Sequence, residues 1–291
     1  MFEIAEHYVC QHSPHKRNAR SEIGIIRILQ KRWQSIQATE ITKSTVLALR
    51  QDLCSQGRAG DTVNHYLSAI SKIYQAASSE LTQDLANPTT GIRRLPQGAG
   101  RIVRLSVEAR AFLLQKCSES SEPLLHPAVN LALETGMRRG ELLSVLWRDL
   151  DLDARRICVR ETKNGETRTI PLTRLAKDCL LAMKNFYRTG KIFPIGAESL
   201  RKHFERTVVK AAREWGHCST NPFWDLRFHD LRHEALSQLS DRGLNVIELS
   251  YISGHKTLRM LSRYTHPSHD SVLHKLDHSE ACQPRLPSEN R

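Results

Sequence analysis

Apolar residues follow a helical spacing along most of the chain, and the segment over residues 87–100 is the clearest interruption of that spacing. Before it, Val46, Leu49 and Leu53 recur three and four positions apart, and a second such series follows Asp61, which we expect to cap a helix. The interrupting segment is rich in arginine and in the turn formers proline and glycine. The sequence therefore predicts a helical domain over residues 1–90, a linker over residues 91–104 and a second domain beyond it.

A short stretch of strand periodicity interrupts the second part. Residues 156–160 and 169–172 alternate between apolar and polar, and Asn164 and Gly165 between them are typical of a tight type I′ turn, because both tolerate positive φ. Helical spacing returns from residue 173 onward. We therefore predict a mainly α protein with a small β-sheet, a mixed α/β domain over residues 105–278 and an irregular tail over residues 279–291.

The charge balance favours a polyanionic partner. The chain has a formal net charge of +12 at pH 7, with 14 Lys and Arg against 8 Asp and Glu in residues 1–104 and 29 against 23 in the remainder. Each part is thus equally basic, so both can contact one ligand such as a nucleic acid. Histones, ribosomal proteins and membrane-surface proteins are basic too, so charge alone leaves these classes open.

The cysteines and the N-terminal residues bear on localisation. Seven cysteines are scattered and never form C-x-x-C, which favours reduced thiols over a disulfide framework or a zinc ribbon. The first ten residues lack the basic start of a signal peptide, and no apolar run approaches the length of a membrane span. We therefore expect a cytoplasmic protein without a membrane partner.

His229 and Arg232 begin a predicted helix whose apolar side consists of Phe228, Leu231, Ala235 and Leu239. Because they are three residues apart, the two polar side chains lie on one neighbouring face of that helix. His229 and His233 also resemble the zinc-protease pattern H-E-x-x-H, although Asp replaces Glu and an arginine would lie among the ligands. A histidine buried in the core is a further alternative for His229.

Downstream, Asn245 and Glu248 are spaced as a capping box, and Gly254 is placed to end the helix that they begin. We expect a further short helix to carry three side chains on one side, Leu258, Leu261 and Tyr264. Taken alone, this succession of helix, turn and helix also fits a helix-turn-helix module that binds DNA, in which Tyr264 would lie in the core or contact a phosphate.

Five motifs, in this order, resemble those of the tyrosine recombinase (phage integrase) family across nearly the whole chain. Residues 133–142 around Arg138 look like the first arginine motif, and the hairpin with Lys163 occupies the place of the family's lysine-bearing β-turn. Residues 228–233, 253–255 and 263–266 look like the H-x-x-R box, the third motif and the nucleophile motif. Each motif alone is weak, but the ordered set is specific. The runs ETKNG, FHDLRHEA, ISGH and RYTH look most similar to shufflon-type DNA invertases.

The resemblance implies a helical core-binding domain, a catalytic domain of the tyrosine recombinase type, and strand cleavage without cofactor or metal. Tyr264 is expected to attack a phosphodiester and form a 3′-phosphotyrosyl link. Arg138 and Arg232 are expected to bind the phosphate, and His229 is expected to remove the proton of the nucleophile. Lys163 is expected to protonate the leaving 5′-oxygen, and His255 to donate a further hydrogen bond to the phosphate. Glu141 is expected to support these residues.

These residue types suit the chemistry. A guanidinium pairs two phosphate oxygens at once and stays charged at any working pH. A phenol with its free pKa of about 10 is only about 0.1% ionised at pH 7, a deficit of roughly 4 kcal/mol, so a base must help. Histidine titrates near neutral pH, and Lys163 is the only lysine between Lys116 and Lys177. Without the resemblance, a solvated turn lysine or a surface Glu141 remains an alternative.

The resemblance further implies that the partners are double-stranded DNA recombination sites and that four copies of the chain assemble on DNA as a homotetramer. It implies strand exchange through a Holliday junction, and accessory DNA-bending proteins are additional candidate partners. Two other functions stay open: a type IB topoisomerase, which relaxes DNA as a monomer, and a non-catalytic DNA-binding regulator. Shufflon-type invertases carry a long C-terminal extension that this sequence does not contain. We therefore leave the outcome open among integration, excision, inversion and resolution.

Overall fold

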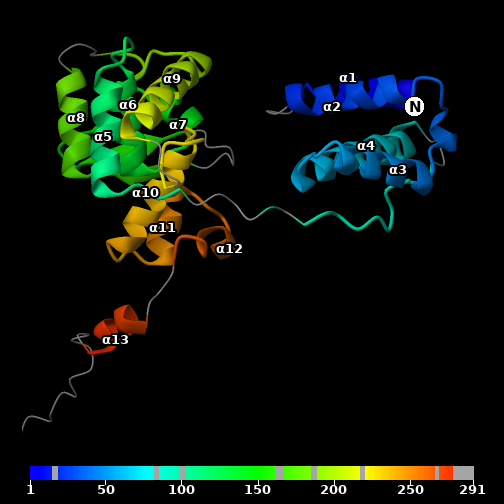
Figure 1. The fold of residues 1–291 in the computed structure, drawn as a ribbon. Helices are drawn as coiled ribbons and strands as arrows, with labels where there is room; N and C mark the ends of the chain where they lie inside the picture. The colour runs from blue at the N-terminus through cyan, green and yellow to red at the C-terminus, as the bar shows by residue number, and fades with distance from the viewer. Residues whose placement is uncertain are drawn as a thin grey trace, which may run out of the picture. The chain divides into compact units, whose positions relative to one another are not determined.

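The computed structural model describes residues 1–14, 19–81, 85–96, 98, 103–160, 167–184, 189–216, 220–265 and 269–277. These residues belong to two compact units, Met1–Gly100 and Arg101–Arg291 (Figure 1). Each unit has its own hydrophobic core. Helices dominate both units, and the second one also contains a small sheet. The expectation of a mainly α protein with a small β-sheet is confirmed. Among the described helices, none is both long enough and apolar enough to cross a bilayer.

The first unit is built around one long helix. Helix α4 (Gly60–Glu80) contacts the other three helices of the unit, α1 (Phe2–His12), α2 (Ala19–Arg32) and α3 (Lys43–Ser55), and a short 3-10 helix, η1 (Ala38–Glu40), precedes α3. Thr42 caps α3 by accepting a hydrogen bond from the Thr45 backbone. The prediction that Asp61 caps α4 is wrong, because the helix begins at Gly60, two residues earlier than predicted, with Ala59 as its cap. Asp61 instead lies in the first turn, where a carboxylate interacts favourably with the helix dipole.

Part of the segment expected as a linker packs against the first unit. Ile92 and Leu95 contact its core, and Asn64 of α4 exchanges two hydrogen bonds with the Leu95 backbone, at 2.9 and 3.0 Å. Arg94 reaches back to the Asn64 carbonyl and the Ser68 hydroxyl. This segment thus follows α4 along a defined path. The exact boundaries of the two domains stay a prediction.

Helix α6 (Leu125–Thr135) lies at the centre of the second unit. It contacts α5 (Val107–Ser118), α7 (Arg139–Ser144), α8 (Arg174–Lys184), α9 (Ala197–Trp215) and α10 (Asp230–Asp241). Nine of its eleven residues are buried, as expected for a helix that is covered on every side. The predicted apolar side of α10, with Phe228, Leu231, Ala235 and Leu239, is buried as well. The remaining helices are α11 (Val246–Ser253), α12 (Leu258–Leu261) and α13 (His269–Asp277).

The sheet has three antiparallel strands in the order β1 (Leu150–Asp151), β2 (Arg156–Val159) and β3 (Arg168–Pro171). The two predicted strands are present, with Cys158 opposite Thr169 and Val159 opposite Arg168. The first strand is only two residues long and follows a 3-10 helix, η2 (Trp147–Asp149), so periodicity alone does not reveal it. The predicted turn at Asn164 and Gly165 lies outside the described residues.

The predicted capping box is present at the start of α11. The Asn245 side chain accepts from the backbone of Ile247 and Glu248, Glu248 accepts from the Asn245 backbone, and Gly254 ends the helix with a left-handed φ of 66°. The prediction for the next helix is partly wrong. Helix α12 is a single turn, so Tyr264 lies beyond its end, and Leu258 is exposed while Leu261 and Tyr264 are buried.

Candidate active site

Arg138 lies at the junction of α6 and α7. Gly136 ends α6 with a left-handed φ of 61°, and Arg138 then occupies the cap position of α7. Glu141, in the first turn of α7, accepts from the Arg138 backbone at 2.9 Å and from its guanidinium Nη1 at 2.8 Å. The same carboxylate therefore fixes both the backbone and the side chain of Arg138.

Arg168 of β3 is a second partner of Glu141, which the sequence reasoning missed. Its Nη1 and Nη2 donate to the two carboxylate oxygens at 3.1 and 2.7 Å, and its Nε donates to the Ile252 carbonyl at 3.0 Å. Burial would raise the pKa of Glu141, but the hydrogen bonds and charges of Arg168 and Arg138 lower it to about 2. The only available signal was a basic residue within a half-buried strand. Glu141 thus joins α7 to β3, and Arg168 joins both to the end of α11.

Arg232 of α10 is almost completely buried, and two backbone carbonyls hold it. Its Nη1 donates to the Gly136 carbonyl and its Nη2 to the Ser253 carbonyl, both at 2.6 Å. Burial and the nearby charge of Arg138 lower the pKa of Arg232 to about 9, so the side chain remains a cation at neutral pH. The guanidinium therefore links the ends of α6 and α11, with its orientation set in advance.

His255 follows the glycine that ends α11 and contacts Arg232. Its Nε2 lies 3.4 Å from Arg232 Nη2, and its Nδ1 lies 2.8 Å from the Ser253 hydroxyl. Because a guanidinium only donates, Nε2 accepts and Nδ1 carries the proton. Burial and the charges of Arg232 and Arg138 lower the pKa of His255 to about 3, so the ring is neutral at pH 7. His255 can donate from Nε2 to a phosphate, as expected, only if the ring gains a proton or changes to the other tautomer. An approaching anion favours the protonated ring.

Tyr264 is buried, and two imidazoles lie near its ring. Its hydroxyl is hydrogen-bonded to Nδ1 of His233, whose ring is stacked on it at 5.7 Å between centroids, and the His255 ring lies at 6.4 Å. Burial raises the pKa of Tyr264, although the charges of Arg263 and Arg232 act in the opposite direction. The sequence reasoning considered His233 only as a metal ligand. A contact between residues 31 positions apart leaves no local signal.

His229 immediately precedes α10 and is exposed to solvent. The centroid of its ring lies 5.1 Å from that of the His233 ring, and the two rings are nearly perpendicular. Partial desolvation of the imidazole and the charge of Arg232 lower the pKa of His229. Within the part of the chain that the structure describes, no group of three or more His, Cys, Asp or Glu side chains is arranged to hold a metal ion. Lys163 lies outside the described residues.

The structure therefore brings five of the six predicted catalytic residues to one region, where α7, α10 and the segment after α11 meet. Among its described members, three arginines outnumber two carboxylates; the arginines are Arg138, Arg168 and Arg232, and the carboxylates are Glu141 and Asp230. Such an arrangement attracts an anion and presents a phenol beside it.

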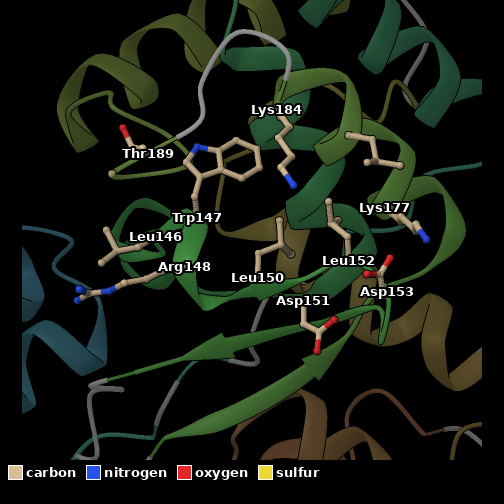
Figure 2. A pocket seen from close by; sticks show the side chains of 12 residues that line it. Leu146, Trp147, Arg148, Leu150, Asp151, Leu152, Asp153, Lys177, Lys184 and Thr189 are labelled. Atoms are coloured by element: carbon tan, nitrogen blue, oxygen red, sulfur yellow. The ribbon is translucent and has the colours of Figure 1, made fainter.

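A separate hollow of about 870 Å³ lies elsewhere in the second unit (Figure 2). Side chains of η2, β1 and α8 line it, including Trp147, Leu150 and Lys184. It shares no residue with the site around Tyr264. A site that acts on a long, rigid polyanion has no need of an enclosed pocket, so we do not assign the reaction to this hollow.

Comparison with known proteins identifies the family. The sequence profile of the phage integrase family matches residues 105–270, more than half of the chain. The shufflon-specific DNA recombinase of Escherichia coli is 35% identical over 220 residues, which cover 75% of this chain and 54% of that protein. This chain therefore belongs to the phage integrase family, and it spans about half the length of that relative.

Solved structures share the fold. The integrase of transposon Tn1549 in complex with circular intermediate DNA matches with a TM-score of 0.75 at 20% identity and covers 94% of this chain and 98% of that chain. A lambda integrase tetramer bound to a Holliday junction matches with a TM-score of 0.73 at 20% identity, with 91% and 76% of the two chains covered. The catalytic domain of the tyrosine recombinase type, expected from the sequence, is thereby confirmed as a fold.

Proposed function

We propose that this chain is a site-specific DNA recombinase that cuts and rejoins double-stranded DNA through a 3′-phosphotyrosyl link at Tyr264. One observation carries the proposal: the Tyr264 ring lies against His255, and His255 in turn contacts the buried guanidinium of Arg232. A nucleophile and a fixed cation thus lie within one connected group. Cleavage of a phosphodiester by a phenol needs both.

Arg138 and Arg232 bind the non-bridging phosphate oxygens in this proposal. Two carbonyls hold Arg232 before any ligand arrives, so little reorganisation is required in the transition state. Nη1 of Arg232 retains a second N–H for the phosphate, whereas Nη2 donates its second N–H to His255 until that ring gains a proton. Loss of either arginine should therefore cost roughly 3–4 kcal/mol of transition-state stabilisation, as for other preorganised donors.

The remaining roles concern protons. His229 takes the proton of Tyr264, Lys163 protonates the departing 5′-oxygen, and His255 donates to the phosphate once it has gained a proton. Glu141 supports Arg138 through its two hydrogen bonds to that residue. The phosphotyrosyl link conserves the energy of the broken bond, so the reaction needs neither cofactor nor metal.

The relatives support the choice of partners. The Tn1549 integrase was solved with circular intermediate DNA, and lambda integrase as a tetramer on a Holliday junction. We extend both features to this chain: four protomers act on two duplex sites, and accessory DNA-bending proteins assist where the sites require bending. The outcome is integration, excision or inversion of a mobile or invertible element, and the reaction takes place in the cytoplasm.

The test is to trap covalent adducts on the DNA of the genome that encodes the protein. Purified protein is incubated with sheared genomic DNA and denatured with SDS, and the protein-linked fragments are precipitated and sequenced. A recombinase enriches one short sequence at the ends of an element, and exhaustive chelation with EDTA leaves the yield unchanged. Adducts without sequence preference, together with plasmid relaxation, would identify a topoisomerase, and specific binding without adducts a regulator.

A further inference from the structure

His233 has no role in the proposed reaction, yet it is hydrogen-bonded to the hydroxyl of the proposed nucleophile. It lies on α10, one residue after Arg232, and its Nδ1 is hydrogen-bonded to the Tyr264 hydroxyl. The two rings are stacked, with 27° between their planes. The contact therefore restrains both the position of the phenol and the direction of its O–H bond.

The protonation states of the pair limit what this contact can do. Burial, followed by the charge of His229, lowers the pKa of His233 to about 4, and burial raises the pKa of Tyr264. At neutral pH the imidazole is therefore neutral and the phenol retains its proton. An imidazole nitrogen is a much stronger base than a phenol oxygen, so the favoured arrangement has the hydroxyl donate to a bare Nδ1, with the ring proton on Nε2.

Given the proposed function, we propose that His233 is a positioning residue, whose bare Nδ1 accepts the Tyr264 hydroxyl proton in a hydrogen bond and thereby orients the attacking oxygen. The helix that carries this acceptor also carries Arg232 at the adjacent position. Helix α10 thus fixes the position of the Tyr264 hydroxyl relative to the guanidinium of Arg232. Complete proton transfer to His233 is unfavourable in the protein without DNA, because burial lowers the pKa of the imidazole and raises the pKa of the phenol. His229 can remove this proton only after the O–H bond turns away from His233, so the hydrogen bond to His233 positions the oxygen before the proton leaves.

The first experiment needs no DNA. With ¹⁵N-labelled histidine, NMR of the full chain should show His233 as the tautomer protonated on Nε2, with its Nδ1 resonance displaced by a hydrogen bond. Y264F removes only the hydroxyl, so it should shift the Nδ1 resonance of His233 and leave the Nε2 resonance in place. A protonated Nδ1, or an Nδ1 resonance unaffected by Y264F, would overturn the proposal.

The second experiment uses adduct formation on genomic fragments that the wild-type protein itself has trapped. Asn carries an amide oxygen one bond from Cγ, where histidine has Nδ1, so H233N retains an acceptor at that place although it cannot titrate. H233N should form adducts within several-fold of the wild-type rate, whereas H233L should be slower by about 10²-fold, the cost expected of a misplaced reacting group. H233Q, with its amide one bond further out, should resemble H233L.

Equal loss in H233N and H233L would show that a titrating imidazole is required, and equal activity of H233L and wild type would show that the contact is dispensable. Either result overturns the positioning role. Thermal unfolding and DNA binding of each variant separate these outcomes from a failure to fold. Failure of the wild-type protein to form adducts would instead refute the proposed function, and the NMR result would still stand or fall by itself.

Discussion

Tyr264 is held in its protonated form in the protein without DNA. Burial raises its pKa, and the cations Arg232 and Arg263 oppose that effect only in part. The proposed nucleophile is therefore unreactive until a phosphate and a base are both in place. The leaving oxygen poses the complementary problem, because an alkoxide departs poorly unless it gains a proton. At the scale of single residues, the proposed reaction thus depends on one base and one acid.

Lys163 is the proposed acid, and its substitution by alanine should be rescued by a better leaving group. Lys163→Ala should cleave ordinary DNA about 10²–10⁴-fold more slowly, which is the usual contribution of a general acid. A substrate with sulfur at the bridging 5′ position leaves as a thiolate and needs no proton. The variant should therefore cleave it nearly as fast as the wild type does, as measured by single-turnover adduct formation.

Arg138→Ala is the matched control for Lys163→Ala. Its defect lies in charge stabilisation, so sulfur at the 5′ position should leave it slow. If sulfur rescues both variants equally, or neither, Lys163 is not the acid and is better described as a turn residue that contacts DNA.

At the scale of elements, the ion pair of Glu141 and Arg168 joins α7, β3 and the end of α11. Glu141 binds Arg138 beside it and Arg168 from the strand, and Arg168 also binds the Ile252 carbonyl. The position of Arg138 therefore depends on the sheet as well as on its own helix.

Glu141→Gln should destabilise the protein in a pH-dependent manner. Burial opposes ionisation of Glu141, but Arg168 and Arg138 hold its pKa at about 2, against an ordinary value of 4.5. A depressed pKa stabilises the fold above the unfolded value, by about 3 kcal/mol here, and this contribution is lost as the pH falls from about 4.5 towards 2. Denaturant unfolding at a series of pH values measures it. A deficit of the variant that is equal at pH 7 and pH 3 would contradict the assignment.

Gly254 is expected to tolerate no side chain. Its φ of +66° is strained for any other residue, and an added Cβ would lie 3.1 to 3.3 Å from the Arg168 side chain. Gly190 has a similar φ of +76°, and among the described residues no atom lies within 4 Å of an added Cβ, so Gly190→Ala isolates the backbone cost of about 1–2 kcal/mol. Gly254→Ala should lose more stability than this control in denaturant unfolding. It should also slow adduct formation, whereas Gly190→Ala should not. Equal effects of the two variants would contradict the close packing of Arg168 on Gly254.

Local signals explain which elements the sequence could predict. The capping box at Asn245 and Glu248 and the alternation in β2 and β3 are encoded within a few residues, and the structure contains these elements. The single turn of α12 is too short for periodicity to define, so the face assigned to Leu258 was wrong. Strand β1 was missed for the same reason. Short elements are fixed by tertiary contacts, which a local pattern does not record.

The site shows the same division between local and long-range information. The motifs around Arg138, Arg232, His255 and Tyr264 could be found because each is a short run of residues. The two partners that hold them, Arg168 and His233, act across 27 and 31 positions of the sequence. Only the fold brings these side chains to Glu141 and Tyr264, so no spacing rule could identify them.

At the scale of the whole molecule, positive charge is spread over the entire chain. Residues 1–104 carry 14 basic against 8 acidic residues, and the remainder carries 29 against 23. DNA binding should therefore use phosphate contacts from both domains, and the logarithm of the affinity should fall with the logarithm of the salt concentration at about −0.9 per phosphate neutralised. Fluorescence anisotropy over a salt series measures the slope. A binding constant that does not change with salt would refute a clamp made of phosphate contacts.

The central claim is the covalent link between Tyr264 and a 3′-phosphate. The most direct test treats a nicked duplex, which carries a sequence trapped from the genome, with the full chain, digests the adduct with nuclease and protease, and identifies the modified peptide by mass spectrometry. We expect the phosphate on Tyr264, and we expect Tyr264→Phe to bind the same duplex without forming an adduct. An adduct that persists in Tyr264→Phe, or that maps to another residue such as the exposed Tyr251, would contradict the claim.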